Sequence, residues 1–278
     1  MPRLHSVDFK WLHSRNSSND MKTVILCGGQ GTRLREETEY RPKPLVEVGG
    51  RPILWHIMKG YAQHNLTDFV LCLGYRGQMI KEYFLNYGAM NNDFTIKLGA
   101  RQDIQYHGEE NEGHFSVTLS DTGLETMTGG RLKRVARYID GPEFCLTYGD
   151  GLSDVDMGRL LEFHRAHGRM ATVTTVRSIS RFGTVRLSDD GLVQHFAEKP
   201  VQDTWISAGF FILDRRVIDY VENDETVFEQ GPLQTLAEEG QLMAYRHDGF
   251  FYAMDTYREY LLLNELWNSG QAPWKTWA

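Results

Sequence analysis

Short apolar runs alternate with longer amphipathic stretches along most of this chain. Buried strands are predicted where apolar residues follow one another without interruption, at 23–26, 69–73 and 144–148. Helices are predicted where apolar residues recur at the spacing of one helix face, at 53–64, 78–87 and 155–167. Because predicted strands and helices alternate along the chain, the pattern favours an α/β fold in which a mostly parallel sheet carries helices on both faces.

Two segments depart from this alternation. Residues 94–119 and 172–211 are rich in strand-forming residues, and turns are indicated at 189–191 and near Pro200. Helical patterns return near the end of the chain, at 217–221, 232–239 and 256–267. No internal repeat or linker is visible, so residues 21–278 are predicted to form one Rossmann-like unit with inserted β-rich segments.

The first twenty residues differ from the rest. They lack apolar periodicity, and they precede a second methionine, Met21. They also lack the apolar run of a secretory signal. Residues 1–20 are therefore predicted to be a disordered leader.

Composition narrows the classes of partner. The formal net charge of −7 over 278 residues argues against a general nucleic-acid binder, which is usually basic. No apolar stretch is long enough to span a bilayer, so no membrane partner is expected. The cysteines Cys27, Cys72 and Cys145 lie in strand-like contexts without a Cys-x-x-Cys pair. Such thiols are typical of a reducing compartment, and a cytoplasmic location is predicted.

A glycine-rich loop follows the first predicted strand. Residues 27–34 read CGGQGTRL, and a basic cluster with two prolines follows at 41–44, containing Lys43. Glycine N–H groups can cradle phosphate oxygens, and Arg33 and Lys43 add positive charge. A Walker loop would need lysine before the threonine or serine, and a dinucleotide fingerprint would need glycine at Leu34. A tight turn without ligand is the alternative, but the two cations favour a nucleoside triphosphate.

Two aspartates are candidates for binding a divalent metal ion. Asp150 lies between glycines at the end of the strand predicted at 144–148, where doubly wound sheets bind ligands. Asp255 precedes the last helix. The alternatives are a turn aspartate for Asp150 and a helix N-cap for Asp255, although Thr256 could also cap. Together the two carboxylates suit Mg²⁺ and a triphosphate.

Three further groups of residues allow two interpretations each. Lys199, within Glu198-Lys199-Pro200, either binds an incoming phosphate or belongs to an exposed turn. The turn at 128–131 either reads a base edge or connects a strand to a helix. His164 and His167 have ligand-like spacing but no acidic or cysteine partner beside them, which favours a solvated helix face over a metal site.

Taken in order, these motifs resemble those of the sugar-1-phosphate nucleotidylyltransferases, and most closely those of the glucose-1-phosphate cytidylyltransferases. The resemblance covers nearly everything from Met21 to Trp277. Its motifs lie at 28–34, 41–44, 52–59, 127–134, 147–151, 198–200 and 272–277. The subfamily signal comes from Glu36-Glu37-Thr38 and from 127–131, which replace the corresponding stretches of thymidylyl- and guanylyl-transferring relatives. The resemblance implies a fold of the nucleotide-diphospho-sugar transferase type.

The resemblance also implies a reaction, in which CTP and α-D-glucose 1-phosphate give CDP-glucose and pyrophosphate. The sugar-phosphate oxygen would attack the α-phosphorus in line, with Mg²⁺ held by Asp150 and Asp255. Arg33 and Lys43 are the implied catalytic residues, because they balance charge on the leaving group and the α-phosphate. The implied nucleotide-binding residues are Leu26, Cys27, Gly28, Gly29, Gln30, Gly31, Thr32, Arg33, Lys43, Thr126, Arg131 and Gly149.

Sugar selection rests on a region that departs from the relatives. The implied sugar-phosphate-binding residues are Gly183, Glu198, Lys199, Ser207 and Tyr252. Ser207-Ala208 stands where relatives typically carry Asn-Gly, and 250–253 replaces a stretch with Trp-Gln. A site that hydrogen-bonds a hydroxyl discriminates strongly, so the loss of an amide could change the accepted hexose.

Other functions remain as alternatives. A different sugar 1-phosphate or nucleotide would keep the same chemistry. A catalytically silent nucleotide-sugar sensor is disfavoured, because such a protein need not keep Lys43, Asp150 and Lys199. A Rossmann oxidoreductase is disfavoured by the missing third glycine. The resemblance also implies a homo-oligomer, for which the β-rich excursion and the tryptophan-rich tail are candidate contacts.

Overall fold

The architecture was established from a computed structural model, which describes residues 21–99, 103–107, 112–180 and 182–277. The predicted leader, residues 1–20, lies outside the described residues. A 7-stranded sheet has the strand order β14-β10-β13-β8-β1-β4-β7. Only β13 runs against its neighbours in this sheet, since its pairs with β8 and β10 are antiparallel. The strands are β1 (Lys22–Cys27), β4 (Asp68–Leu73), β7 (Ser116–Asp121), β8 (Glu143–Tyr148), β10 (Ala171–Ile179), β13 (Val201–Asp214) and β14 (Leu242–Arg246).

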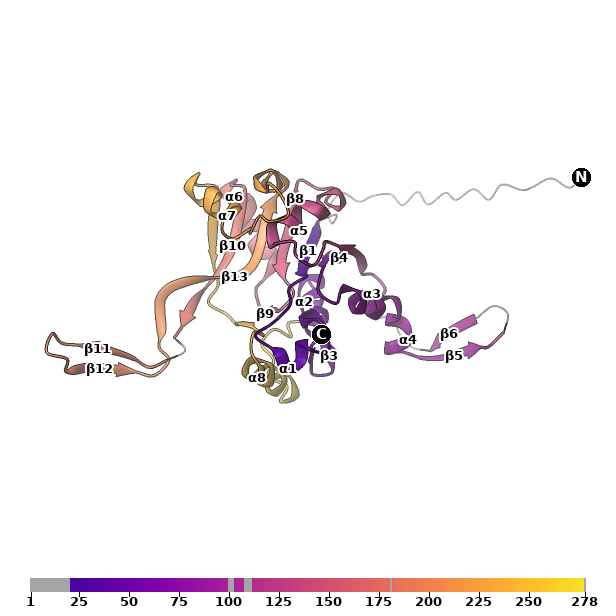
Figure 1. The fold of residues 1–278 in the computed structure, drawn as a ribbon, viewed down its shortest axis with the longest axis horizontal. Coiled ribbons are helices and arrows are strands. Elements are labelled where there is room, and N and C mark those ends of the chain that lie inside the picture. The colour runs from indigo at the N-terminus through magenta and orange to yellow at the C-terminus, as the bar shows by residue number, and fades with distance from the viewer. Residues whose placement is uncertain (1–20, 100–102, 108–111, 181, 278) are drawn as a thin grey trace, which may run out of the picture.

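Helices cover both faces of this sheet, which confirms the predicted α/β class (Figure 1). In β1, Ile25 and Cys27 pack on one face, while Val24 and Leu26 pack on the other. This is why the strand reads as a continuous apolar run. The first face carries α2 (Ile53–Ala62), α3 (Gly77–Leu85), α6 (Met157–His167) and α8 (Tyr257–Asn268). The second carries α5 (Thr128–Val135), the 3-10 helix η3 (Arg215–Tyr220) and α7 (Pro232–Glu238).

Short elements connect the layers and shape the loops. They are α1 (Arg35–Thr38), η1 (Lys43–Leu45), β2 (Glu47–Val48), β3 (Arg51–Pro52), α4 (Tyr87–Asn91), η2 (Ala136–Tyr138), β9 (Gly151–Ser153) and β15 (Phe251–Ala253). None of the helices in the described part of the chain has the length and apolar character needed to cross a membrane.

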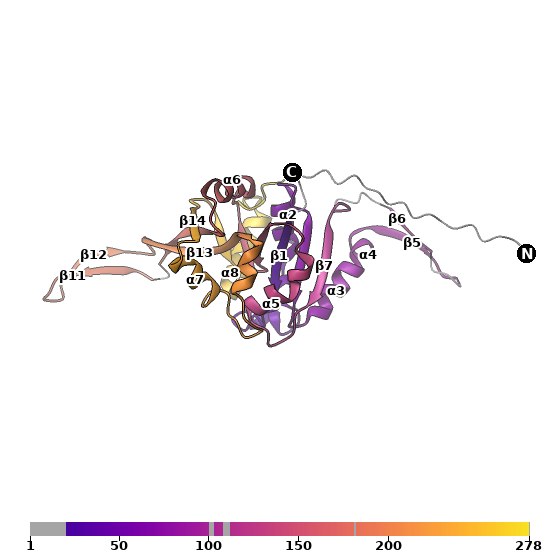
Figure 2. The same ribbon diagram turned by 90° about the horizontal axis from the view of Figure 1, so that it is seen from above.

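Two β-hairpins project from opposite sides of the body (Figures 1 and 2). One arm is formed by β5 (Asp93–Lys97) and β6 (Asp103–His107), the other by β11 (Thr184–Leu187) and β12 (Val193–Ala197). The expectation of a single β excursion over 94–119 was wrong in its second part. There β7 joins the main sheet, parallel to β4, because its apolar side chains Val117 and Leu119 pack on the core.

The histidines on α6 correct a second expectation. His164 is only 3% exposed, so it does not lie on a solvated face. Its Nδ1 and the Nε2 of His167 both contact the hydroxyl of Thr172, at 2.8 and 2.7 Å. Since Thr172 lies on β10, the pair attaches α6 to the sheet. In the described part of the chain, no group of three or more potential ligands could hold a metal ion.

The tryptophan-rich tail packs against its own chain. Trp274 is 1% exposed, and its indole N–H donates to Nδ1 of His56 at 3.3 Å. His56 in turn contacts the carbonyl of Val48 through Nε2 at 2.8 Å. The bond from Trp274 makes Nδ1 the acceptor, so the neutral imidazole carries its proton on Nε2. The buried Trp274 therefore belongs to the internal packing of α2 against the tail.

We expect this histidine to make the fold sensitive to acid. Burial lowers the pKa of His56 from 6.5 to about 4. The unfolded chain therefore binds the proton first, and stability is lost as the pH falls from about 6.5 towards 4, by about 3 kcal/mol in all. Urea unfolding at pH 7 and pH 5 measures the effect. A His56→Gln variant, which keeps a donor and an acceptor, should lose less stability over the same interval, whereas an equal loss would exclude His56 as the cause.

Candidate active site

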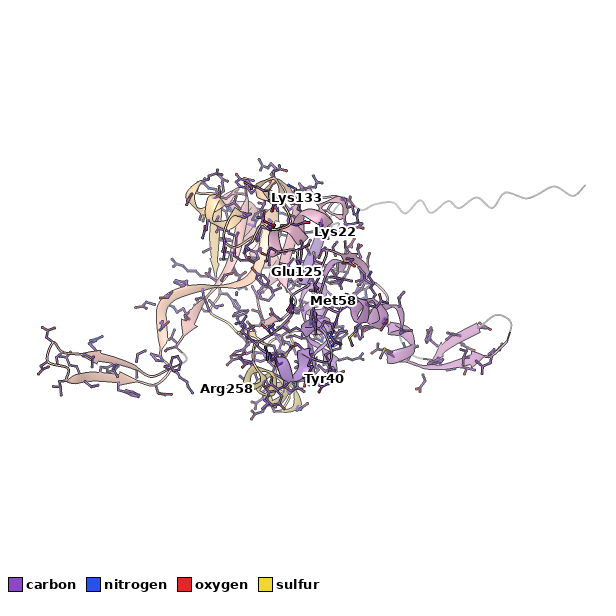
Figure 3. The ribbon with its side chains drawn as sticks, viewed as in Figure 1. Lys22, Tyr40, Met58, Glu125, Lys133 and Arg258 are labelled. Atoms are coloured by element: carbon purple, nitrogen blue, oxygen red, sulfur yellow. The ribbon has the colours of Figure 1, made fainter. Side chains whose placement is uncertain are left out.

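One cavity of about 430 Å³ lies at the carboxyl ends of β1 and β8. Its volume is in the range of small-molecule sites, and its position matches the ligand crevice of open α/β sheets. All twelve residues expected to bind nucleotide line it, and so does Asp150. The segment 124–128, which leads into α5, lines it as well. Figure 3 shows Glu125, from this segment, in the central body between the two arms.

Arg131 organises the walls of this cavity. It is 5% exposed, and its terminal nitrogens donate to oxygens of the glycine-rich loop, the end of β4 and the segment 122–124. These acceptors are the carbonyls of Gly28, Leu73, Gly123 and Leu124 and the hydroxyl of Thr122, at 2.7–3.3 Å. Burial lowers the pKa of Arg131, but these acceptors compensate the buried charge. The expected role of Arg131 in nucleotide recognition stays a prediction and takes an indirect form, in which Arg131 positions the loops.

The glycine at position 28 is required by this arrangement. A Cβ atom on Gly28 would lie 2.1 Å from Nη1 of Arg131. Gly29 is different, because a Cβ atom there would meet nothing within 4 Å. One glycine therefore makes room for a buried side chain, and the next leaves the cavity open to a ligand.

A short ladder brings the two candidate metal ligands together. β9 pairs with β15, with Gly151 opposite Ala253, and the N–H of Met254 donates to the carbonyl of Asp150 at 2.9 Å. Asp150 precedes the first strand and Asp255 follows the second, so both carboxylates lie at the same end of the ladder. Their closeness depends on this pairing of distant segments.

Lys43 lies between the two carboxylates. Its Nζ is 2.6 Å from Oδ2 of Asp150 and 2.8 Å from Oδ1 of Asp255. Burial by itself would lower the pKa of Lys43, but the two aspartates outweigh it and raise the pKa, so the lysine stays charged. The guanidinium of Arg33 also reaches Oδ1 of Asp255 at 3.0 Å, with its side chain 71% exposed. Two anions and two cations thus face one another, and three of the four residues, Arg33, Lys43 and Asp150, line the cavity.

The structure excludes Asp255 as the N-cap of α8, while its role as a metal ligand stays a prediction. The N-cap of α8 is Thr256, which forms a capping box with Glu259. Glu259 also accepts from the N–H groups of Asp255 and Thr256, at 3.0 and 2.6 Å. The carboxylate of Asp255 is therefore not used as a cap and points at Lys43 and Arg33 instead.

The expected sugar-phosphate residues fall into separate groups. Gly183 and Glu198 lie side by side at the root of the second arm, where a Cβ atom on Gly183 would be 3.0 Å from Oε2 of Glu198. Nζ of Lys199 is 3.9 Å from Oε1 of Glu198. Ser207 lies on β13 and Tyr252 on β15. Across the described residues, no hydrogen bond or ion pair joins these groups to Lys43 or Asp150.

Sequence reasoning did not assign a role to several wall residues. Tyr148 and Thr128 line the cavity, and both hydroxyls donate to Glu229. The only sequence signal for Tyr148 was its place directly before Gly149-Asp150. Glu229 carried no signal, because it lies 81 residues after Tyr148 in the sequence.

Comparisons with known proteins agree with this geometry. A family model described as nucleotidyl transferase matches residues 22–256. The chain is 51% identical over 259 residues to the glucose-1-phosphate cytidylyltransferase of Salmonella typhi, covering 92% of this chain and 100% of that protein. It is 45% identical over 258 residues to a probable glucose-1-phosphate cytidylyltransferase of Bacillus subtilis (strain 168), with the same coverage of both chains.

A solved structure supports the fold. The crystal structure of UDP-glucose pyrophosphorylase complexed with UDP-glucose superimposes with a TM-score of 0.65 at 14% identity, over 90% of this chain and 99% of that one. At this identity the likeness concerns the fold alone. It confirms that the mostly parallel sheet belongs to the type expected from the sequence.

Proposed function

Because the chain belongs to the nucleotidyl transferase family, we propose that it transfers the cytidylyl group of CTP to α-D-glucose 1-phosphate, giving CDP-glucose and pyrophosphate. In this reaction an oxygen of the sugar phosphate bonds to the α-phosphorus, and the bond from the α-phosphorus to the pyrophosphate oxygen breaks. The observation that carries the proposal is the cavity, in which the glycine-rich loop, Lys43 and Asp150 meet. The relatives at 51% and 45% identity support the choice of substrates.

The cations would act on the phosphates. Lys43 stays charged beside the two aspartates, so it can contact the α-phosphate, where negative charge builds up in the transition state. The exposed guanidinium of Arg33 lies at the mouth of the cavity, and it would balance the charge on the departing pyrophosphate. The backbone N–H groups of residues 28–31 would hold the remaining oxygens. No residue needs to form a covalent bond, because positioning and electrostatics suffice.

Asp150 and Asp255 fit a magnesium site. Mg²⁺ binds hard oxygen ligands and is usually held in proteins by one or two carboxylates together with phosphate oxygens and water. The pair of aspartates that converges on Lys43 supplies such carboxylates. When bound there, Mg²⁺ would neutralise part of the triphosphate charge. Lys43, which lies beside both carboxylates, would contact the α-phosphate.

Glu198 and Lys199 would bind the acceptor. Lys199 has a φ of 46°, a left-handed conformation that costs about 1–2 kcal/mol for a residue with a Cβ atom. The neighbouring Pro200 disfavours a helical backbone as well. A strained turn at the root of an arm favours a lysine held in position to bind a ligand over a lysine in an ordinary exposed turn. Gly183, Ser207 and Tyr252 would contact the hexose.

The lysine assignment predicts a selective kinetic defect. Lys199→Met should raise the KM for glucose 1-phosphate by about tenfold or more, because a charge-assisted bond to phosphate is lost. The KM for CTP should change by less than about twofold, since Lys199 does not line the nucleotide cavity. Initial rates with each substrate varied in turn measure both constants. Equal increases in the two constants would place Lys199 outside the acceptor site.

A substrate panel tests the function itself. Pyrophosphate release is measured with CTP, UTP, dTTP and GTP, each against the 1-phosphates of glucose, mannose and galactose, with and without Mg²⁺. CTP with glucose 1-phosphate should give the highest rate, and omission of Mg²⁺ should abolish it. A preference for another hexose would trace to Ser207-Ala208 or 250–253, whereas a preference for another nucleotide would reject the assignment of the 127–131 segment.

We further propose that residues 21–278 form one catalytic domain and that the protein is a cytoplasmic homo-oligomer. The buried, unpaired thiols suit a reducing compartment.

Both arms expose apolar side chains, which is costly for an isolated chain and typical of a surface that another protein covers. The exposed apolar side chains include Phe94, Ile96, Ile104 and Tyr106 on one arm and Val185, Leu187, Val193 and Phe196 on the other. Light scattering after gel filtration measures the number of copies.

A further inference from the structure

A single carboxylate joins two walls of the candidate nucleotide cavity. The hydroxyl of Tyr148, at the end of β8, donates to Oε1 of Glu229. The hydroxyl of Thr128, at the start of α5, donates to Oε2 of the same residue at 2.7 Å. Both Tyr148 and Thr128 line the cavity, whereas Glu229 lies behind them. The side chain of Glu229 therefore ties the hydroxyls of Tyr148 and Thr128 to one another.

The directions of these hydrogen bonds are determined. The hydroxyl of Thr128 accepts from the N–H of Phe228 at 2.9 Å, so its own proton is free to point at Glu229. Burial raises the pKa of Tyr148, and the charge of Glu229 raises it further, so the phenol stays protonated and donates. Glu229 thus accepts one bond on each oxygen. An apolar residue at position 229 could not replace this arrangement.

The rest of each wall is held in place independently. A Cβ atom on Gly209 would lie 2.3 Å from Cδ2 of Tyr148, so the ring rests directly on β13. On the other side, the N–H groups of Met127 and Gly129 donate to the carbonyls of Asp224 and Thr226 at 2.8 and 3.0 Å. The segment 224–229 therefore supports the start of α5, and Glu229 is the member of this segment that extends across to β8.

We propose that Glu229 is a positioning residue for the nucleotide, which sets the spacing of Tyr148 and Thr128 and thereby the affinity and selectivity for the base. The inference rests on the proposed function, because it takes the cavity to be the nucleotide site. Glu229 acts through the two hydroxyls and does not touch the reacting atoms. The loop at 127–131, which the sequence marks as characteristic of the subfamily, is thus held in place by a residue outside that loop.

Binding of CTP to the intact protein tests this proposal without relying on turnover. Glu229→Leu keeps the size but removes both acceptors, and it should raise the dissociation constant for CTP by about tenfold or more. Glu229→Gln should stay within about threefold, because its amide can accept from Thr128 and donate to the oxygen of Tyr148. The ratio of CTP to UTP affinity should fall in Glu229→Leu and be largely restored in Glu229→Gln.

A matched control lies on the same segment. Asp224→Asn weakens the exposed ion pair with Arg134, whose atoms are 2.5 Å apart, but leaves the backbone bonds to α5 intact. It should bind CTP as the wild-type protein does. If Glu229→Leu does not fold, Tyr148→Phe and Thr128→Val each remove one of the two bonds and should weaken CTP binding.

The possible outcomes separate this inference from the proposed function. A wild-type protein that fails to bind CTP would reject the proposed function. A wild-type protein that binds CTP, together with a Glu229→Leu variant that binds it equally well, would reject the role of Glu229 alone. Weak binding by Glu229→Gln as well as Glu229→Leu would also reject it, because hydrogen bonding to the two walls would then not be the cause.

Discussion

Asp150→Asn is expected to lower kcat by about 1,000-fold or more, which corresponds to about 4 kcal/mol of transition-state stabilisation. The amide keeps the shape of the side chain but has no negative charge for Mg²⁺ or for Lys43, whose Nζ is 2.6 Å from Oδ2. Asp255 still pairs with Lys43 at 2.8 Å, so the lysine is not left without an anion. Thermal unfolding should therefore change little. Single-turnover rates with saturating CTP measure the loss.

A matched control makes the same chemical change away from the cavity. Asp156 is the N-cap of α6, and its Oδ1 accepts from the N–H of Arg159 at 3.0 Å. Asp156→Asn should leave kcat unchanged and cost less than about 1 kcal/mol of stability, because asparagine also caps helices well. Near-normal turnover of Asp150→Asn would show that Asp150 is not a metal ligand, and the pairing with Asp255 would then be structural.

Gly28→Ala is expected to destabilise the fold by about 3 kcal/mol or more. The added methyl group would lie 2.1 Å from Nη1 of Arg131 and 2.2 Å from its Cζ. An arginine tip could normally move aside, but this one is held by oxygens of Leu73, Gly123 and others. Moving it would leave buried carbonyls without donors and collapse the walls that they hold. Urea unfolding measures the loss in stability.

Gly29→Ala is the neighbouring comparison and should behave in the opposite way. Its methyl group would meet nothing within 4 Å, so stability should stay within about 0.5 kcal/mol of the wild type. Gly29 lines the cavity, however, and the methyl group would enter space that the triphosphate needs. The dissociation constant for CTP should rise by about tenfold or more. Equal unfolding midpoints for the two variants would contradict the packing of Arg131 on Gly28.

Much of the fold could be predicted because its signals are local. The strands at 23–26, 69–73 and 144–148 are apolar on both faces, and each became a central strand of the sheet. The glycine-rich loop was also local, since its glycines and Arg33 all lie within residues 28–33. Register and sheet membership were not local. For this reason β7 was misplaced, as its apolar pattern does not say which neighbour it will pair with.

Tertiary structure decided the chemistry of the polar residues. Asp255 is not the cap of α8, because Thr256 and Glu259 form the capping box, and its carboxylate meets Lys43 instead. The terminal nitrogens of Arg131 are engaged by backbone carbonyls, so its role in nucleotide recognition stays a prediction in an indirect form. His164 suggested a solvated face until it was found buried against Thr172.

By itself, then, the sequence determined the α/β class, the glycine-rich loop and the family, because each rests on neighbouring residues whose spacing or backbone freedom has few structural solutions. Only the tertiary structure decided which distant polar side chains come together, such as Asp150 with Asp255 and Tyr148 with Glu229. Hydrogen bonds and ion pairs act over a few ångströms, and no local pattern states which segments the chain will bring that close.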